Sequence, residues 1–457
     1  MRRLAWIAAA LGACTCTLLF AAGCSDGGSS GSTGTTDTTA PADTAGGDDT
    51  AAGDDVLPVD TTAPADTVAP VQDDVRVVTL LDGVELDLVN GKSIDIPVEI
   101  PANTISVTVS ALGTADGTYV VNKWVQSDGS VLVTPNWLTQ GSEQDQGGIC
   151  MSCADRATMS EGAIALIAPN NPSVTLVPGE HTVSIFGIKQ KPVAGQSGGT
   201  CGDGTCTFID QFQCPQDCAP SPLNGKVLLS VFAKVSPDGV VPDTGVLDLN
   251  LHFTGARGWT AATAPTDADF QAVLDSLRTI YAQVGLTIGE ITYRDIDARF
   301  QVIESVTGPN SDLMELYSQS EGNALNALDL YFVDELSSQF GIILGVAGGI
   351  PGPPLVQGSQ RSGVAIVVKQ IQGVPAGVDT TMAHEMGHFL GLFHTSEQAF
   401  FPPQIHDPLP DTPENDESYL MFNTGAGNVL SPYQGRVMRS NPWVRHPADT
   451  TLGEDGL

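Results

Sequence analysis

The first part of the chain that can fold alternates apolar and polar residues at the period of a strand. Short β-branched runs at 105–109, 162–167 and 181–185 show this alternation, and Asp-Gly or Asn-Gly pairs punctuate the region. Period-two alternation is typical of half-buried strands, and these dipeptides favour tight turns. We therefore predict an all-β sandwich or jelly roll over residues 75–192.

Beyond residue 223 the pattern changes to strands interleaved with helices. Residues 267–284 place their apolar side chains on one stripe, which predicts a long amphipathic helix. Such interleaving favours a mixed α/β sheet. The expected fold class is α+β and multidomain, with the N-terminal sandwich followed by an α/β domain over residues 223–457. The predicted strands of that domain are 245–253, 286–296, 328–333 and 363–368.

Residues 24–74 consist mainly of Thr, Ala, Asp, Gly, Pro and Ser, with almost no large apolar side chain. Such a composition cannot bury a core, so we expect a disordered, extended tether. The tether has no Lys or Arg and carries part of the formal net charge of −34. Because the folded part is acidic as well, the charge argues against a nucleic-acid partner.

The N-terminus has the features of an export signal. Arg2 and Arg3 precede an apolar run at 4–22, which is too short and wrongly flanked for a membrane span. The run ends in Phe-Ala-Ala-Gly-Cys24, which resembles the lipobox of bacterial lipoproteins. The resemblance implies a signal peptide over residues 1–23 and a lipid on Cys24, which would anchor the protein to the outer membrane or cell surface. An ordinary signal peptide cut nearby is the alternative.

Six cysteines remain in the exported part, which suits disulfide bonds. Cys150 and Cys153 can bridge locally, and a cysteine-switch latency mechanism is the alternative for this pair. The segment 193–222 resembles a small Cys-rich module of exported bacterial proteins, which implies two disulfides. A structural zinc is the alternative there, and four cysteines allow three pairings. The cysteines of this segment are Cys201, Cys206, Cys214 and Cys218.

The strongest signal for chemistry is the pattern H-E-x-x-H-x-x-G-x-x-H at residues 384–394. Positions i and i+4 of a helix share one face, so His384 and His388 can bind one ion. Gly391 lets the helix end and the chain turn, which brings His394 round as a third ligand. Three protein ligands leave the fourth position of a tetrahedral zinc open for water, as in catalytic sites. Glu385 is placed to reach that water as the catalytic base.

This pattern resembles the metzincin clan of zinc endopeptidases, whose signature continues with a Met-turn after the third histidine. Residues 418–423 supply the candidate turn, and the resemblance implies that Met421 forms the floor beneath the zinc. Met438 is the alternative, although it lies in a predicted helix. In that clan the sheet is backed by two helices, one of which carries the zinc ligands.

Within the clan, the segments 411–413 and 430–438 look most like the pappalysin-like branch. Residues 430–438 form a predicted closing helix, with Ser431 as N-cap and Pro432 in the first position. Tyr419 and Asn423 depart from the residues that are common in this branch. Asn423 stands where many metzincins have a tyrosine that helps to hold the oxyanion.

The resemblance implies zinc-dependent hydrolysis of a peptide bond in a protein or peptide substrate. Residues 345–347 would form the edge strand along which an extended substrate pairs, and a Gly/Pro-rich surface loop is the alternative. Pappalysin-like enzymes also use calcium downstream of the zinc helix, so Ca²⁺ is a second candidate cofactor, with a solvated acidic loop as the alternative. The acidic residues of that region are Asp407, Asp411, Glu414, Asp416 and Glu417.

Together these features predict a zinc metalloendopeptidase tethered to a bacterial envelope. The competing hypothesis is a catalytically silent surface-binding lipoprotein whose β domain acts as an adhesin. The sandwich itself has no identifiable chemistry. A spacer, a module that binds substrate or cell wall, and a prodomain all fit its sequence.

Overall fold

The computed structural model describes residues 18–19, 75–140, 148–191, 201–206, 217–308, 310–324, 326–337, 342–369, 376–397 and 405–446. The predicted tether, Cys24, Cys214 and all of the predicted signal peptide except Leu18–Leu19 lie outside these residues. No helix among the described residues is long and apolar enough to span a bilayer.

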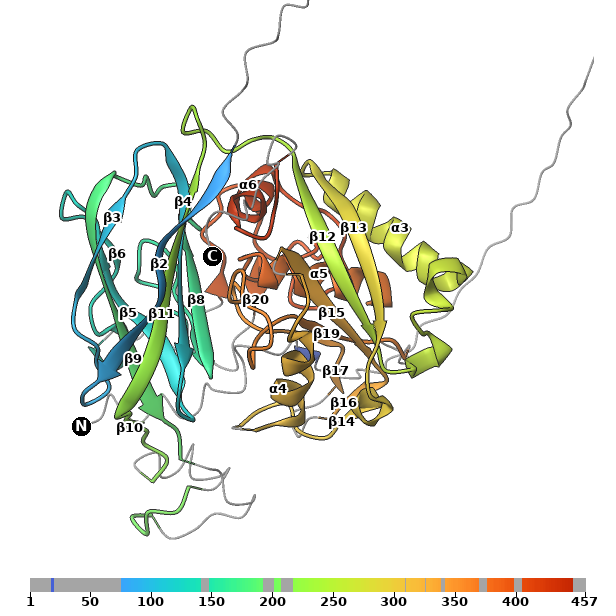
Figure 1. The fold of residues 1–457 in the computed structure, drawn as a ribbon, viewed down its shortest axis with the longest axis horizontal. Helices are drawn as coiled ribbons and strands as arrows, with labels where there is room; N and C mark the ends of the chain where they lie inside the picture. Colours follow the sequence, from blue (N-terminus) through green and yellow to red (C-terminus); the bar gives the residue numbers. More distant parts are fainter. Residues whose placement is uncertain are drawn as a thin grey trace, which may run out of the picture. The chain divides into compact units, whose positions relative to one another are not determined.

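Two antiparallel sheets form the predicted sandwich (Figure 1). Odd-numbered residues of β4 and β11, such as Val109 and Leu229, are buried in one cluster with Trp124 of β5 and Ile185 of β9. The first sheet has the order β2 (Arg76–Leu88), β11 (Gly225–Val235), β4 (Thr104–Gly113) and β8 (Ala163–Ala168). The second has the order β10 (Ser221–Pro222), β9 (Gly179–Lys189), β5 (Thr118–Val125) and β6 (Val131–Val133), with β3 (Ile96–Ile100) paired to β9 and β7 (Met159–Glu161) paired to β5.

The position of β11 corrects the predicted boundary between the domains. The sequence pattern predicts that the sandwich ends at residue 192 and that the α/β domain begins at 223. Strand β11 follows the Cys-rich segment and pairs on both sides with sandwich strands β2 and β4. The Cys-rich segment is therefore an insertion before the last sandwich strand, and the sandwich extends to Val235.

A mixed five-stranded sheet organises the α/β part, as the interleaved pattern predicts. Neighbours in its core are parallel, and β18 pairs antiparallel with β19 at one edge. The order is β13 (Leu286–Asp295), β12 (Gly245–Phe253), β15 (Ala327–Val333), β19 (Val364–Val367) and β18 (Gly345–Ala347). These strands match the four predicted runs within a few residues, and residues 345–347 are a strand rather than a loop.

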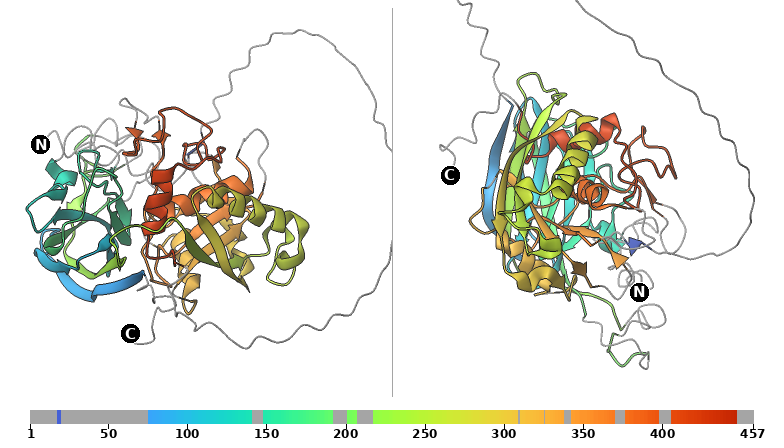
Figure 2. Two further views of the ribbon diagram at one scale, coloured as in Figure 1. Left: turned by 90° about the horizontal axis from the view of Figure 1, so that it is seen from above. Right: turned by 90° about the vertical axis from the view of Figure 1, so that its right-hand side faces the viewer.

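Two helices cover one face of this sheet, α3 (Ala268–Ala282) and α5 (Val378–Phe389) (Figures 1 and 2). The carboxylate of Asp267 caps α3 by accepting a hydrogen bond from the Phe270 N–H at 2.9 Å. The apolar stripe of α3 packs with Leu249 and Leu251 of β12 and with Met382 and Met386 of α5. This shared core fixes α5 relative to the sheet.

The start of α5 does not follow from residue type alone, because Asp379 and Thr380, both of types that favour the N-cap, lie inside its first turn. The N-cap is Gly377. The hydroxyl of Thr380, in the first turn, accepts a hydrogen bond from the Gly377 N–H at 3.1 Å. The Asp379 carboxylate instead accepts a hydrogen bond from the Ser276 hydroxyl of α3 at 2.7 Å.

The remaining helices and strands are short, apart from α6. Helix α6 (Pro432–Ser440) begins as predicted, with Ser431 as N-cap in a capping box with Gln434. The others are α1 (Trp137–Gln140), α4 (Asp312–Tyr317), β1 (Leu18–Leu19), β14 (Val302–Ile303), β16 (Glu335–Leu336), β17 (Ile342–Ile343), β20 (Ser396–Glu397), β21 (Ile405–His406) and the 3₁₀ turns η3 (Ala256–Gly258), η4 (Ala264–Thr266), η5 (Ala298–Gln301) and η6 (Ser318–Ser320).

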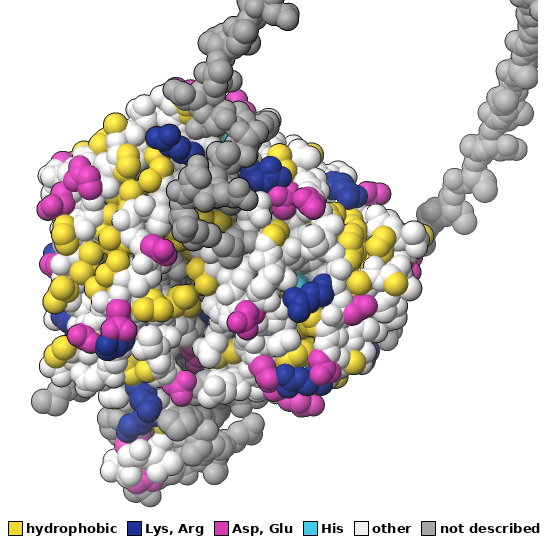
Figure 3. Space-filling view, in the orientation of Figure 1, with side chains coloured by type: hydrophobic (Ala, Val, Ile, Leu, Met, Phe, Trp, Pro, Cys, Tyr) yellow, Lys and Arg dark blue, Asp and Glu magenta, His cyan; other side chains and the backbone are white. Residues whose placement is uncertain are grey.

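Charged side chains do not gather by sign on the face drawn in Figure 3. Lysine and arginine side chains lie there as scattered groups among acidic ones, without a continuous basic patch.

Candidate metal centre

Three imidazoles converge at the C-terminal end of α5. His384 and His388 lie one turn apart on this helix and are buried. The helix ends at Phe389, and Gly391 follows with a φ of 109°, a conformation that side chains other than glycine rarely adopt. The turn brings His394 back toward the helix, so that its Nε2 lies 3.2 Å from Nε2 of His384 and 3.1 Å from Nε2 of His388.

Backbone carbonyls orient the two helical histidines. Nδ1 of His384 lies 2.6 Å from the Leu420 carbonyl oxygen, and Nδ1 of His388 lies 2.7 Å from the Leu392 carbonyl oxygen. A carbonyl only accepts hydrogen bonds, so both Nδ1 atoms carry the proton in the neutral rings. The lone pairs of both rings are therefore on Nε2, which faces the other imidazoles. This is the tautomer and the supporting bond that a metal-binding histidine requires.

Burial keeps these rings neutral. It lowers the pKa of His384 to about 3, and the neighbouring His394 adds to the effect. Burial also lowers the pKa of His388 well below its usual range, with smaller contributions from His384 and His394. Neutral imidazoles are the form that binds a metal ion. Within the described part of the chain, this triad is the group of His, Cys, Asp or Glu residues whose ligand atoms gather closely enough to hold one, all within 4.8 Å.

Glu385 lies next to the edge strand of the sheet. Its side chain is buried, with 2% exposed. A Cβ placed on Gly345 of β18 would stand 2.5 Å from Cγ of Glu385, so only glycine fits at this strand position. The carboxylate predicted as catalytic base thus lies beside the strand predicted to bind substrate.

The turn that contains Met421 lies against the zinc-binding helix. A Cβ on Gly387 of α5 would stand 2.6 Å from Sδ of Met421, which is fully buried. The Met421 carbonyl accepts the Thr395 N–H at 2.8 Å, next to the third histidine. Together with the bond between the Leu420 carbonyl and His384, these contacts hold residues 420–421 against the helix that carries the first two histidines. Met438, the alternative, lies on α6.

The acidic residues downstream of the triad mostly support backbone turns. Asp411 accepts hydrogen bonds from the Ser431 hydroxyl at 2.8 Å and from the Tyr433 N–H at 2.9 Å, at the start of α6. Asp416 accepts the Ser418 N–H at 3.0 Å, and Asp407 accepts the Thr412 hydroxyl at 2.6 Å. These bonds use Asp411, Asp416 and one oxygen of Asp407 within the fold, and they give the calcium prediction no support.

Disulfides occupy the described cysteines. Cys150 bridges Cys153, and Cys206 bridges Cys218. Cys201 is disulfide-bonded as well. These bonds favour the disulfide prediction over a structural zinc, and they leave no free thiol at Cys150 or Cys153 for a cysteine switch. The sequence pattern also gave no sign that the side chain of Arg156, which follows the first disulfide, contacts Phe393 beside the third histidine.

No protein-family model and no curated protein matches the sequence. Among solved structures, the chain is similar to metalloproteinase-II from Bacteroides fragilis, with 16% identity and a TM-score of 0.26. That match covers 47% of this chain and 63% of the other, so this chain spans less than two thirds of that protein.

Two structures from infectious bursal disease virus are also similar. They are a mutant VP2 protein and the Gt strain, with 17% and 14% identity and a TM-score of 0.14 each. Each match covers 38% of this chain, and they cover 45% and 47% of the viral chains. At such TM-scores none of these likenesses carries an argument, so the site is interpreted from its own geometry.

Proposed function

We propose that this protein is a zinc-dependent endopeptidase held at a bacterial envelope. The observation that carries the proposal is the convergence of three Nε2 atoms, two of them on imidazoles whose Nδ1–H groups are bound to backbone carbonyls. Three nitrogen ligands with an open fourth position are typical of catalytic zinc. The lipobox-like sequence at Cys24 and the disulfides support export and a lipid anchor.

Each residue of the site has a role in this function. Zinc bound to the triad would polarise the scissile carbonyl and make a water nucleophilic near neutral pH. The Glu385 carboxylate would accept a proton and return it to the leaving amine. Strand β18 ends the sheet beside Glu385, and its backbone would pair with an extended peptide. The substrate class that follows is an unfolded or extended protein segment.

The Glu385→Gln variant tests this mechanism. We expect it to bind one zinc per chain like the parent and to cleave a mixed peptide library at least 100-fold more slowly, since a positioned base contributes about 10²–10⁴. The matched control is Glu304→Gln, an exposed glutamate outside the site, which should cut like the parent. Full activity in Glu385→Gln would refute the mechanism.

The lipid anchor is tested on the same full-length preparation. Mass spectrometry of the N-terminal peptide should find lipid on Cys24, and an unmodified Cys24 would refute the anchor.

A further inference from the structure

The β-sandwich contacts the turn that carries the third histidine. A Cβ on Gly391 would stand 3.1 Å from Cγ2 of Ile167 on sandwich strand β8. Two residues later, the Phe393 ring lies 5.8 Å from the guanidinium carbon of Arg156, which belongs to the sandwich. Phe393 directly precedes His394 in the chain. The sandwich therefore touches the zinc-binding loop immediately before its ligand.

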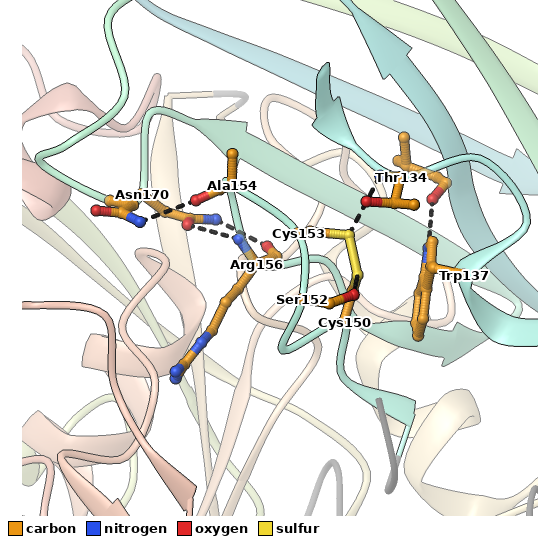
Figure 4. The surroundings of a disulfide bond; sticks show 10 residues. Thr134, Trp137, Cys150, Ser152, Cys153, Ala154, Arg156 and Asn170 are labelled. Atoms are coloured by element: carbon orange, nitrogen blue, oxygen red, sulfur yellow. Dashed lines mark hydrogen bonds between the residues drawn. A yellow bond between two sulfur atoms is a disulfide. The ribbon is translucent and has the colours of Figure 1, made fainter. Parts of the chain in front are cut away.

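The backbone around Arg156 is fixed on the sandwich side. Asn170 pairs with Arg156 in both directions, with its Oδ1 accepting the Arg156 N–H at 2.9 Å and its Nδ2 donating to the Arg156 carbonyl at 2.8 Å. The Asp155 carboxylate accepts the Asn170 N–H at 2.8 Å. The Cys150–Cys153 disulfide closes the preceding loop, and Figure 4 shows the Arg156 side chain extending away from it. These contacts hold Arg156 on a rigid base.

Burial of the Arg156 guanidinium costs folding free energy, because one of its donors is unpaired. Arg156 is 8% exposed and Phe393 6% exposed, and the Nη1 atom of Arg156 has no hydrogen-bond partner among the described residues. The charge that faces it is Asp407, whose Oδ2 also has no partner there, and each charge favours the ionised form of the other. A buried arginine with an unpaired donor lowers the stability of the fold, so a functional role would explain its presence here.

The third ligand needs outside support more than the other two do. His384 and His388 are placed by a helix, whereas His394 follows a glycine turn on a short loop. The Thr395 N–H bond to Met421 fixes the loop after the histidine, and the Phe393 contact fixes it before. Metal sites require their ligands to be held within about 0.5 Å.

We propose that Arg156 is a positioning residue for the third zinc ligand, acting through Phe393, and that the sandwich is thereby part of the zinc-binding unit. The proposal rests on the proposed function. A second contact supports the permanence of this arrangement, because the fully buried Lys234 of β11 donates to the carbonyls of Arg439, Asn441 and Val444 at 2.9, 3.0 and 2.5 Å. A spacer or a removable prodomain has no need for such contacts.

The test is the Zn²⁺ affinity of the full-length protein, measured by competition with a chelator. We expect Arg156→Gln to weaken Zn²⁺ binding by about 10–100-fold, the usual effect of losing a residue that orients a ligand. The matched control is Arg299→Gln, because Arg299 lies 4.2 Å from the Phe300 ring centroid in an exposed position and should leave the affinity unchanged. Phe393→Leu, which removes the ring from the other side, should give the same loss and should not add to that of Arg156→Gln. It also provides the test if Arg156→Gln fails to fold.

A spectroscopic readout separates positioning from general stability. With Co²⁺ in the site, the absorption bands of Arg156→Gln should shift relative to the parent, and those of Arg299→Gln should not. Arg156→Lys retains the charge but not the planar stacking group, so it should behave like Arg156→Gln. Parental Zn²⁺ affinity in Arg156→Gln would overturn this inference alone. A parent protein that binds no zinc would overturn both the inference and the proposed function.

Discussion

Buried histidines occur in two contrasting settings in this molecule. In the metal centre, His384 and His388 bond only backbone carbonyls through Nδ1 and turn Nε2 toward other imidazoles. In the polar face of the sheet, Nε2 of His252 lies 2.7 Å from the Asp329 carboxylate, and the ring stacks on Tyr331 at 4.5 Å. The same residue type thus presents Nε2 to other imidazoles in one place and to a carboxylate in the other.

The contrast shows what distinguishes a metal site from a structural histidine. A structural histidine pairs with a group of opposite charge or polarity inside the fold, as Nε2 of His252 does with Asp329, and in this case the buried Nδ1 has no partner among the described residues. In the triad, the Nε2 lone pairs of His384 and His388 face Nε2 of His394, where one cation could bind all three rings.

The largest effect is expected for His384→Asn. The Asn Nδ2 group can still donate to the Leu420 carbonyl, but the Nε2 ligand atom is lost. Removing a ligand should weaken Zn²⁺ binding by more than the roughly 10–100-fold effect of a supporting residue, with little change in the melting temperature of the metal-free protein. Zinc retained at one per chain after dialysis would break the comparison, because His384 would then be structural like His252.

The converse is expected for His252→Ala. Its removal leaves Asp329, which is 2% exposed, without its histidine partner, so the free energy of unfolding should fall by about 3 kcal/mol. Zinc content should stay at one per chain. The control is His252→Gln, whose Nε2 can still donate to Asp329 and should recover part of the stability. Denaturant unfolding measures both variants, and loss of zinc from a folded His252→Ala would contradict the contrast.

The motif that defines the metal centre could be predicted from sequence because its geometry is local. Residues i and i+4 share a helix face, and a glycine turn returns the chain, so the convergence of His384, His388 and His394 follows from spacing alone. The start of α5 could not be predicted in this way. Asp379 is a good capping residue, but Ser276 of α3 takes its carboxylate, and that partner lies 103 residues away.

The sandwich was predicted as a fold but not as a contributor to the site. Alternation along the chain identifies strands, but it does not show which side chains of the sandwich contact the α/β domain. Arg156 and Lys234 stand at unremarkable positions in the sequence, and their roles depend on contacts more than 200 residues away. The boundary was missed because the Cys-rich segment interrupts the sandwich before β11, so the change in composition does not mark the end of the domain.

The smallest effect at neutral pH is that of His446, whose contribution to stability changes only below pH 6.5. Burial lowers the pKa of His446 to about 4, and the nearby Lys234 ammonium adds to the effect. The unfolded chain takes up this proton near pH 6.5 while the folded protein stays neutral. The stability due to neutral His446 is therefore complete above pH 6.5 and is lost as the pH falls toward 4, by about 3 kcal/mol.

His446→Asn isolates this contribution, because an Asn Nδ2 can still donate to the Thr244 carbonyl, which lies 2.7 Å from Nδ1 of His446, and does not titrate. The unfolding free energy is measured for the parent and the variant, both without metal. The value of the parent minus that of the variant should be constant above pH 6.5. It should fall between pH 6.5 and pH 4, because only the parent loses stability there. A difference that stays constant over this whole range would show that His446 titrates alike in the folded and unfolded states. The imidazole would then be accessible to solvent. Residues 439–446 would then pack less tightly against β11 than the three Lys234 hydrogen bonds indicate.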